Sequence, residues 1–256
     1  MNPNNGRASY FQKKASLTKP GTPVMRQRWE DLIFLHWRYD PDVLRRMIPE
    51  ELEIDTFQGH AYISIVAFRM LGVRPLMAPA LPWLSYFNEF NMRLYVRDQR
   101  GTPGVYFISL DCDRTPAVWI ARTLFSLPYM HAKIDFPAII TGEQSSNQFS
   151  FVCQRSSKEA AATYIWRTND ISSPTSHGSL DFFLAERYHF FVKRGGALRI
   201  GEVRHEPYLV SIPEVAQWST SPFIWNGLTP PKDPPLLCHY SQGVDVTALS
   251  LVSLTS

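Results

Sequence analysis

The chain has 256 residues, of which 45% are hydrophobic and 19% are charged, and its formal net charge is +3. This composition is typical of a globular protein with one large domain. So weak a charge, without basic runs, argues against nucleic-acid binding. No apolar run is long enough to span a bilayer, and the N-terminus lacks the pattern of a secretory signal. Three widely spaced cysteines indicate a reducing compartment, so we expect a cytoplasmic protein without nucleic-acid or membrane partners.

The N-terminal part predicts a leader followed by two long strands. Residues 1–24 are polar and aperiodic, which predicts a flexible leader, and residues 25–256 are expected to form a single domain. Residues 29–38 and 61–70 predict strands, with a short helix between them that Asp40 caps.

The loop after the second strand is rich in proline and yet apolar. It contains Met77, Leu81 and Trp83. Such a loop either packs against the body of the protein as a connector or lines the mouth of a pocket.

The centre of the chain predicts an antiparallel hairpin with one polar face. Residues 91–96 alternate with period two, a turn follows at residues 98–101, and residues 105–111 form a second β-rich run. The polar side chains that share one face of the first strand are Glu89, Asn91, Arg93 and Tyr95. On residue types alone, that face is either the solvated outside of a sheet or the wall of a binding site.

A helix is predicted over residues 115–127, ended by Pro128. Arg122 lies on the apolar face of this helix, and a buried guanidinium requires a carboxylate partner. Glu89 and Asp111 are the nearest candidates for that partner. The pair would belong either to a functional site or to a structural salt bridge. A tight pair would lower the pKa of Glu89 and make it a poor acid near neutral pH.

The C-terminal half predicts many short strands and few helices. Strands are predicted over residues 149–155, 163–167, 189–194, 197–205, 236–240 and 244–251, and helices after Ser179 and over residues 213–218. This pattern favours one mainly antiparallel barrel or sandwich decorated by helices. Near the end of the first helix, Glu186, Arg187 and Tyr188 form a polar cluster, which is either a helix-terminal salt bridge or the wall of a cavity.

Motifs for phosphate, dinucleotide and acyl-transfer chemistry are absent from the sequence. The histidines are scattered and lack metal-ligand spacing, so neither a metal nor a cofactor is expected. His205 precedes Glu206 and Pro207 and is interpreted as a hydrogen-bonded turn residue, with a general base as the alternative. Cys112 and Cys153 lack an activating base nearby in the sequence and are interpreted as inert, buried thiols.

Several short motifs follow one another in a recognisable order. They are Trp29, Leu32, Phe34, His36-Trp37, residues 48–55, 87–96, 104–111, 121–122, 127–129, 186–188 and 205–208. This order resembles that of the YqjF-like family of uncharacterised proteins, within the acetoacetate-decarboxylase-like superfamily. The resemblance covers nearly the whole chain from residue 29 to residue 251.

The resemblance implies a mainly β, α+β fold: a closed, cone-shaped antiparallel barrel with flanking strands and a few short helices. It also implies a buried cavity at the centre of the barrel. This changes the interpretation of the polar face, because the inside of a ligand-holding barrel can be polar. Glu89 would then stand where acetoacetate decarboxylase places a cavity glutamate. The resemblance also suggests assembly into a homo-oligomer.

Acetoacetate decarboxylase works through a Schiff-base lysine, and a second lysine directly after it lowers the pKa of the first. Both lysines follow the proline that matches Pro128. Here Tyr129 and Met130 occupy these positions, and neither can form an imine. Lys133 has the same strand parity as Tyr129 but lies roughly 13 Å further along an extended strand. Lysine-imine chemistry is therefore expected to be absent.

We hypothesise that the cavity binds a small ligand that contains a carboxylate or carbonyl group. If the protein is an enzyme, of a lyase- or hydrolase-like kind acting on keto or carboxylic acids, Glu89 and Arg122 would be its catalytic residues. The expected ligand-binding residues are Asn91, Arg93, Asp111, Tyr129, Glu186 and His205. One alternative is a non-catalytic module that senses a ligand or binds a protein. A minor alternative is a decarboxylase or aldolase that uses Lys133.

Overall fold

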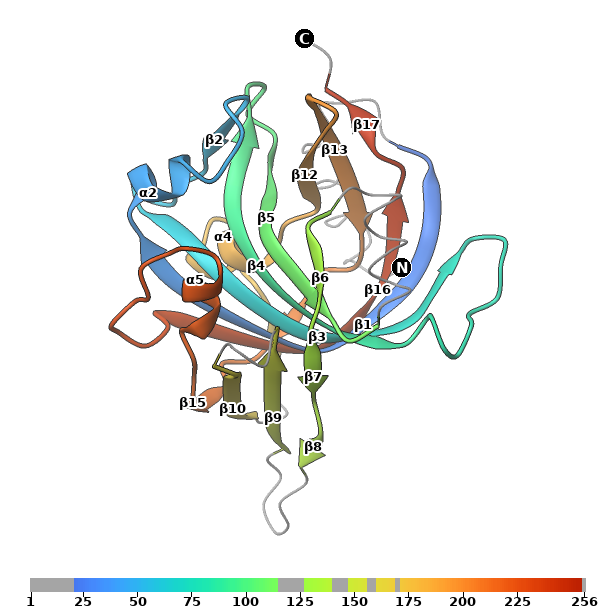
Figure 1. Ribbon diagram of the computed structural model, residues 1–256, viewed down its shortest axis with the longest axis vertical. Helices are drawn as coiled ribbons and strands as arrows, with labels where there is room; N and C mark the ends of the chain where they lie inside the picture. The colour runs from blue at the N-terminus through green and yellow to red at the C-terminus, as the bar shows by residue number, and fades with distance from the viewer. Residues whose placement is uncertain (1–20, 115–126, 140–146, 156–159, 169–170, 255–256) are drawn as a thin grey trace.

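The computed structural model describes residues 21–114, 127–139, 147–155, 160–168 and 171–254. Strands dominate these residues, and Figure 1 shows a large curved sheet that opens toward the top of the view, with a smaller sheet beneath it. Every helix in the described part of the chain is too short or too polar to cross a membrane.

The larger sheet closes on itself. Its strands are β1 (Pro23–Tyr39), β2 (Leu52–Ile54), β3 (Ala61–Pro75), β4 (Phe87–Asp98), β5 (Pro103–Cys112), β6 (Tyr129–His131), β12 (His189–Arg194), β13 (Ala197–Arg204), β16 (Leu237–Leu249) and β17 (Val252–Ser253). The path β4–β3–β1–β16–β13–β12–β5 is closed into a ring by a further pairing of β4 with β5. The closed, mainly β barrel is thus confirmed, although β12 and β5 pair in parallel within the expected antiparallel order.

A smaller sheet covers the outside of this ring. Its strands are β7 (Lys133–Asp135), β8 (Ala138–Ile139), β9 (Asn147–Gln154), β10 (Ala162–Thr168) and β15 (Glu214–Gln217), and β11 (Ser173–Pro174) pairs separately with β14 (Leu209–Val210). Its aromatic residues Phe151 and Tyr164 lie against Phe90 of β4, with ring centroids 5.6 and 5.9 Å apart. The main hydrophobic core therefore lies between the two sheets.

Both faces of β4 are buried, which decides the position of the site. Phe90, Met92, Leu94 and Val96 are fully buried in the core against the smaller sheet. On the opposite face, Glu89, Asn91, Arg93 and Tyr95 are at most 8% exposed. The interpretation of this polar face as the solvated outside of a sheet is wrong, because the closed ring places it inside the barrel.

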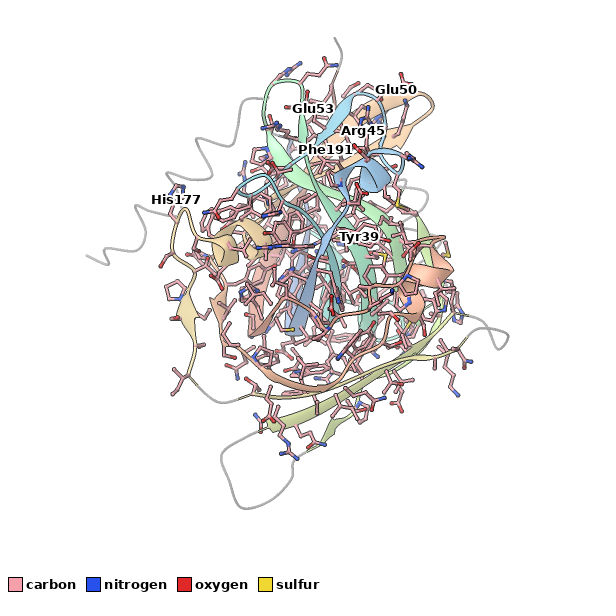
Figure 2. All side chains as sticks on the ribbon, turned by 90° about the vertical axis from the view of Figure 1, so that its left-hand side faces the viewer. Tyr39, Arg45, Glu50, Glu53, His177 and Phe191 are labelled. Carbon is pink, nitrogen blue, oxygen red and sulfur yellow. The ribbon has the colours of Figure 1, made fainter. Side chains whose placement is uncertain are left out.

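The helices are short. They are α2 (Pro41–Arg45), α4 (Leu180–Ala185) and α5 (Ser221–Trp225), and α2 and α4 begin at side-chain caps. The Asp40 side chain accepts from the backbone N–H of Asp42, and Ser179 caps α4 in the same way. Arg45, the last residue of α2, donates to the backbone carbonyl oxygens of Pro49 and Glu50 in the turn that follows the helix. Figure 2 shows Arg45 and Glu50 close together at one end of the molecule.

Two predicted elements are corrected. Residues 213–218 contain strand β15 instead of a helix, because this segment pairs with the edge of β10. Residues 236–251 contain the single strand β16 (Leu237–Leu249) instead of two strands around a turn at Gly243. The predicted helix over residues 115–127 falls almost entirely outside the described residues.

The alternation of β1 breaks at Asp31, whose φ of 52° is left-handed. As a result Trp29 and Leu32, three residues apart, both contact the hydrophobic cluster inside the ring. The carboxylate of Asp31 accepts from Arg69 and from the Tyr240 hydroxyl, which holds this conformation. On the neighbouring strand β16, Gly243 lies opposite Glu30 at the same break.

Gly243→Ala is expected to lower the free energy of unfolding by more than the cost of placing alanine at a positive φ. An added Cβ would lie 2.5 Å from the Trp29 carbonyl oxygen, so backbone must move. Gly59→Ala is the matched control, because Gly59 also has positive φ but nothing within 4 Å of an added Cβ. Urea unfolding should give a loss of about 1–2 kcal/mol for the control and clearly more for Gly243→Ala. Equal losses would contradict the proposed close contact.

Candidate functional site

A cavity of about 250 Å³ lies inside the ring and is lined mainly by apolar side chains. Its largest apolar lining residues are Trp29, Phe68, Phe87, Phe107, Phe190 and Tyr208. Its charged and polar lining residues include Glu89 and Arg93 of β4, Tyr129 of β6, and Arg187. Mostly apolar cavities with a few convergent polar groups are typical of small-molecule sites.

Glu89 is the buried acid of this cavity. The Tyr129 hydroxyl donates to Glu89 Oε2 over 2.5 Å, and Asn91 Nδ2 donates to Glu89 Oε1 over 3.2 Å. Burial raises the pKa of Glu89 to about 7, and these two hydrogen bonds only partly oppose the shift. A carboxyl group with this pKa can give or take a proton near neutral pH.

The Asn91 side chain matches both protonation states of Glu89. Its Oδ1 is buried without a hydrogen bond while its Nδ2 donates to the carboxylate. Turning the amide by 180° would bring Oδ1 toward Glu89, where it could accept the proton of the neutral acid. Asn91 therefore supports a carboxyl group that changes its charge.

Arg93 is a buried cation at the cavity wall. Its Nη2 donates to the Leu184 carbonyl oxygen over 3.0 Å, and its guanidinium lies 5.3 Å from the Phe34 ring centroid. Its Nε is buried without a hydrogen bond, and no carboxylate of the described residues forms an ion pair with it. A guanidinium desolvated in this way favours an anionic partner.

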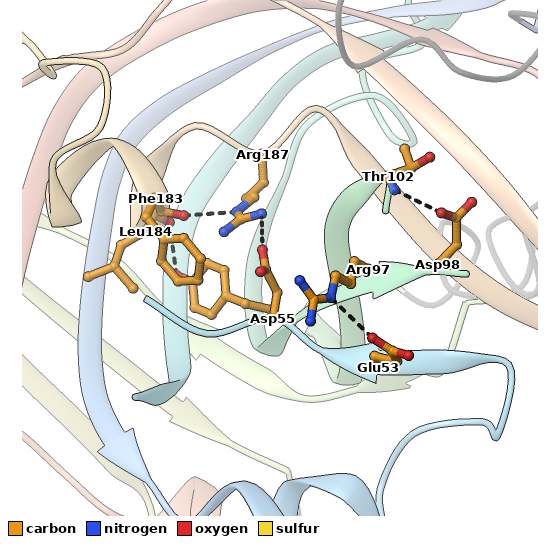
Figure 3. A network of polar contacts seen from close by, with 9 residues as sticks. Glu53, Asp55, Arg97, Asp98, Thr102, Phe183, Leu184 and Arg187 are labelled. Carbon is orange, nitrogen blue, oxygen red and sulfur yellow. Dashed lines mark hydrogen bonds and ion pairs between the residues drawn. The ribbon is translucent and has the colours of Figure 1, made fainter. Parts of the chain in front are cut away.

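The second arginine of the cavity is already paired. Arg187 donates to Asp55 over 2.8 Å and to the Phe183 carbonyl oxygen, as Figure 3 shows. Its side chain is 5% exposed and stacks over the Phe183 ring. Arg187 therefore adds little net positive charge. Two other arginines of the lining have no ion pair among the described residues: Arg74, which is partly exposed and donates to the Gly72 carbonyl oxygen, and Arg93, which is buried.

Glu186 and His205 lie together beside the cavity. Glu186 accepts from the Tyr188 hydroxyl over 2.6 Å and from the Tyr208 backbone N–H over 2.8 Å, and burial raises its pKa to about 7. His205 Nδ1 donates to the Glu206 carbonyl oxygen, while Nε2 is buried without a partner. Burial lowers the pKa of His205 to about 4, so its imidazole is neutral.

The sequence did not predict a buried chain of hydrogen-bonding contacts behind Arg93, called the relay below. Asp181 Oδ1 lies 2.8 Å from His239 Nε2, His239 Nδ1 lies 3.1 Å from His36 Nε2, and His36 Nδ1 lies 2.5 Å from Ser64 Oγ. Ser64 in turn contacts the Tyr95 hydroxyl, which donates to the same Leu184 carbonyl as Arg93. The relay thus fixes the position of α4 against Arg93. The scattered positions of these residues left no signal in the sequence.

Asp111 does not lie at the cavity. It shares the outer face of β5 and forms a bidentate ion pair with Arg155, with both contacts 2.7 Å long. Asp111 lies opposite Phe90 of β4, whose side chain belongs to the core between the two sheets. Its expected ligand-binding role is therefore replaced by a structural ion pair. The role expected for Arg122 falls outside the described residues.

The cysteines and Lys133 also lie outside the cavity. All three cysteines are free and buried, and burial raises the pKa values of Cys112 and Cys238 to about 12. Lys133 is exposed on β7, so the position expected for a relocated catalytic lysine faces solvent. Among the described residues, no group of three or more potential ligands could hold a metal ion.

Two comparisons place the chain among known sequences. The family DUF2071, described as an uncharacterized conserved protein, matches residues 26–245. The uncharacterized protein YqjF of Bacillus subtilis (strain 168) is 35% identical over 237 residues, which cover 92% of this chain and 95% of that protein. An acetoacetate decarboxylase of Streptomyces nogalater is 29% identical over 114 residues, or 44% of this chain and 41% of that protein.

Solved structures share the fold at low sequence identity. The enduracididine biosynthesis enzyme MppR complexed with pyruvate has a TM-score of 0.61 at 14% identity, and the match covers 95% of this chain and 94% of that chain. Acetoacetate decarboxylase from Legionella pneumophila has a TM-score of 0.61 at 12% identity, covering 96% and 95% of the two chains. These likenesses show the acetoacetate-decarboxylase-like fold and leave the reaction open.

Glu89→Gln is expected to stabilise the protein at high pH. The folded pKa of about 7 lies above the ordinary value of 4.5, so ionisation opposes folding as pH rises through this window. Relative to the variant, the wild type should lose about 3 kcal/mol of unfolding free energy between pH 4 and pH 8. Urea titrations at several pH values measure this, with the exposed Glu53→Gln as control. A pH-independent difference would show that Glu89 is not desolvated.

Proposed function

The chain belongs to the DUF2071 family of uncharacterized conserved proteins, and on this premise we propose that its central cavity binds a small organic acid without lysine-imine chemistry. The ligand carboxylate pairs with Arg93, and a carbonyl or other oxygen of the ligand faces Glu89 and Tyr129. The observation that carries the proposal is the buried guanidinium of Arg93, which has no ion-pair partner among the described residues.

The charges around the cavity support an anionic ligand. Arg187 is neutralised by Asp55, and Glu186 is held partly protonated at neutral pH by a pKa of about 7. Arg93 lies near enough to Glu186 to lower that pKa slightly, but the two form no ion pair. A bound carboxylate would supply the negative charge that Arg93 lacks. The pyruvate complex of the structural neighbour MppR adds support for this class of ligand.

The positions of the lysines support the absence of an imine. Lys133, Lys193 and Lys232 are the lysines of the described residues, and all three are exposed. At the position where the resemblance to acetoacetate decarboxylase places the Schiff-base lysine, Tyr129 donates to Glu89. A phenol cannot condense with a ketone, so the chemistry of this cavity differs from that of the decarboxylase.

Acid–base catalysis is a second candidate, favoured by the pKa of Glu89. A carboxyl group that titrates near pH 7 is matched to proton transfer at neutral pH. Glu89 would then take a proton from a carbon next to the ligand carbonyl, or return one, while Tyr129 donates to the oxygen. Solvent deuterium exchange into a bound oxo acid, followed by NMR and abolished in Glu89→Gln, distinguishes this from binding alone.

Arg93→Met should weaken binding of carboxylates by about 30-fold or more, because a desolvated charge loses its partner. Isothermal titration with hexanoate and with 5-oxohexanoate measures the change. Arg97→Met is the matched control, since Arg97 lies four residues further on β4 and forms an exposed ion pair with Glu53. The proposal fails if both variants bind alike, or if the wild type binds neither acid.

Borohydride treatment with acetoacetate should leave the mass of the wild-type chain unchanged. Tyr129→Lys is the positive counterpart, because it places an amine beside Glu89 inside the cavity. Intact-mass spectrometry should detect a reduced adduct in this variant only. An adduct on the wild-type protein, mapped to Lys133 or another lysine by peptide analysis, would overturn the imine-free assignment.

A further inference from the structure

We propose that the acid bound in the cavity has an apolar body, as in a medium-chain alkanoate or an arylalkanoate, and is not a small hydrophilic acid. This inference rests on the proposed function and names the substrate class of the same site. It follows from how polar and apolar side chains are distributed along the cavity wall.

The register of the sheet places apolar side chains on both sides of the polar face of β4. On β3, Phe68 lies opposite Glu89. On β5, Leu110 lies opposite Asn91 and Phe107 lies opposite Arg93. Directly opposite residues of neighbouring strands point to the same face. A ligand that lies along β4 therefore contacts carboxyl and guanidinium groups at its ends and hydrocarbon at its sides.

The two charged groups are far apart along the strand. Glu89 and Arg93 are separated by four residues on one face of β4, which is roughly 13 Å between their Cα atoms. No ion pair joins their side chains. An acid as short as acetate can reach only one of the two, whereas a longer chain can extend from Arg93 toward Glu89.

The remaining walls are mainly apolar, with Gln27, Arg74 and His189 as polar exceptions. Trp29 packs on Phe68 with ring centroids 5.4 Å apart, and Met70 and Phe190 complete this side. The loop between β3 and β4 adds Leu84 to the lining of the cavity. A hydrophilic acid would leave these surfaces in contact with water, whereas an alkyl or aryl group would remove them from it.

The volume of the cavity sets the size of the apolar body. The volume of about 250 Å³ equals that of ~8 water molecules in the liquid. Because a methylene group is similar in size to a water molecule, we expect the best straight-chain acid to have about eight carbon atoms. The cavity is open on one side, so the end of a longer acid would extend toward solvent, where an added methylene removes less apolar surface from water.

A chain-length series on the wild-type protein tests the inference. Isothermal titration would use acetate, butanoate, hexanoate, octanoate and dodecanoate, with octanamide as the uncharged counterpart of octanoate. The dissociation constant should fall about fourfold per added methylene up to roughly eight carbon atoms. Octanamide should bind at least 30-fold more weakly than octanoate, because it lacks the charge for Arg93.

The possible results separate the two proposals. If carboxylates bind with an affinity that does not rise with chain length, the apolar-body inference is overturned and the proposed organic-acid site stands. If no carboxylate binds, or if octanamide binds as well as octanoate, the proposed function itself is overturned. Affinity that continues to rise through dodecanoate would overturn the assigned size.

A cavity-filling variant gives an independent test of where the alkyl group lies. Ala248 of β16 lines the cavity, so Ala248→Leu should weaken octanoate binding about tenfold and leave butanoate unchanged. Thr247→Leu is the matched control, because Thr247 is the next residue on the same strand and does not line the cavity. Equal octanoate affinity in both variants would place the alkyl group elsewhere and overturn the inference.

Discussion

The double burial of β4 is the constraint on which the rest of the structure depends. Its apolar face is covered by the smaller sheet, and its polar face is enclosed because β4 pairs with both β3 and β5 in a closed ring. Charged side chains on this second face cannot be solvated by bulk water. A charged group there must form an ion pair, change its protonation state or remain without an ion-pair partner. The cavity contains an example of each case.

Arg187 has found a partner in Asp55, Glu89 titrates near neutral pH, and Arg93 keeps an unpaired guanidinium within the described residues. Free energy stored in such unpaired buried groups is released when a complementary ligand binds. The arrangement is therefore better suited to binding an anion than to maximal stability. By comparison, each member of the chain of contacts from Asp181 to Ser64 has a hydrogen-bond partner, and this chain positions α4 instead of lining the cavity.

The shared fold keeps a chamber inside the ring, and the proposed function gives this chamber a different chemistry. At the position where acetoacetate decarboxylase has its Schiff-base lysine, the resemblance places Tyr129, whose hydroxyl bonds Glu89. Under the proposed function, a phenol in place of the amine gives up imine formation but retains a hydrogen-bond donor at this wall of the cavity. A barrel can thus change its reaction while its strands and core are maintained, because the function resides in a few side chains.

The sequence by itself determined the hairpin of β4 and β5, the alternation that groups Glu89, Asn91 and Arg93, and the absence of a lysine after Pro128. These are local properties, since period-two alternation and turn residues act between near neighbours in the chain. The resemblance to a known family added the closed barrel. The helix predicted at residues 213–218 was wrong because pairing with β10, which is distant in sequence, outweighs local propensity.

Only the tertiary structure decided which charged groups are paired. Asp111 and Glu89 have the same side-chain chemistry, yet the core side of the barrel gives Asp111 an arginine while the cavity side leaves Glu89 desolvated. The break at Asp31 and the relay through His36 and His239 likewise depend on strands more than 200 residues apart. The physical reason is that burial and electrostatic pairing are set by neighbours in space, and ring closure selects those neighbours.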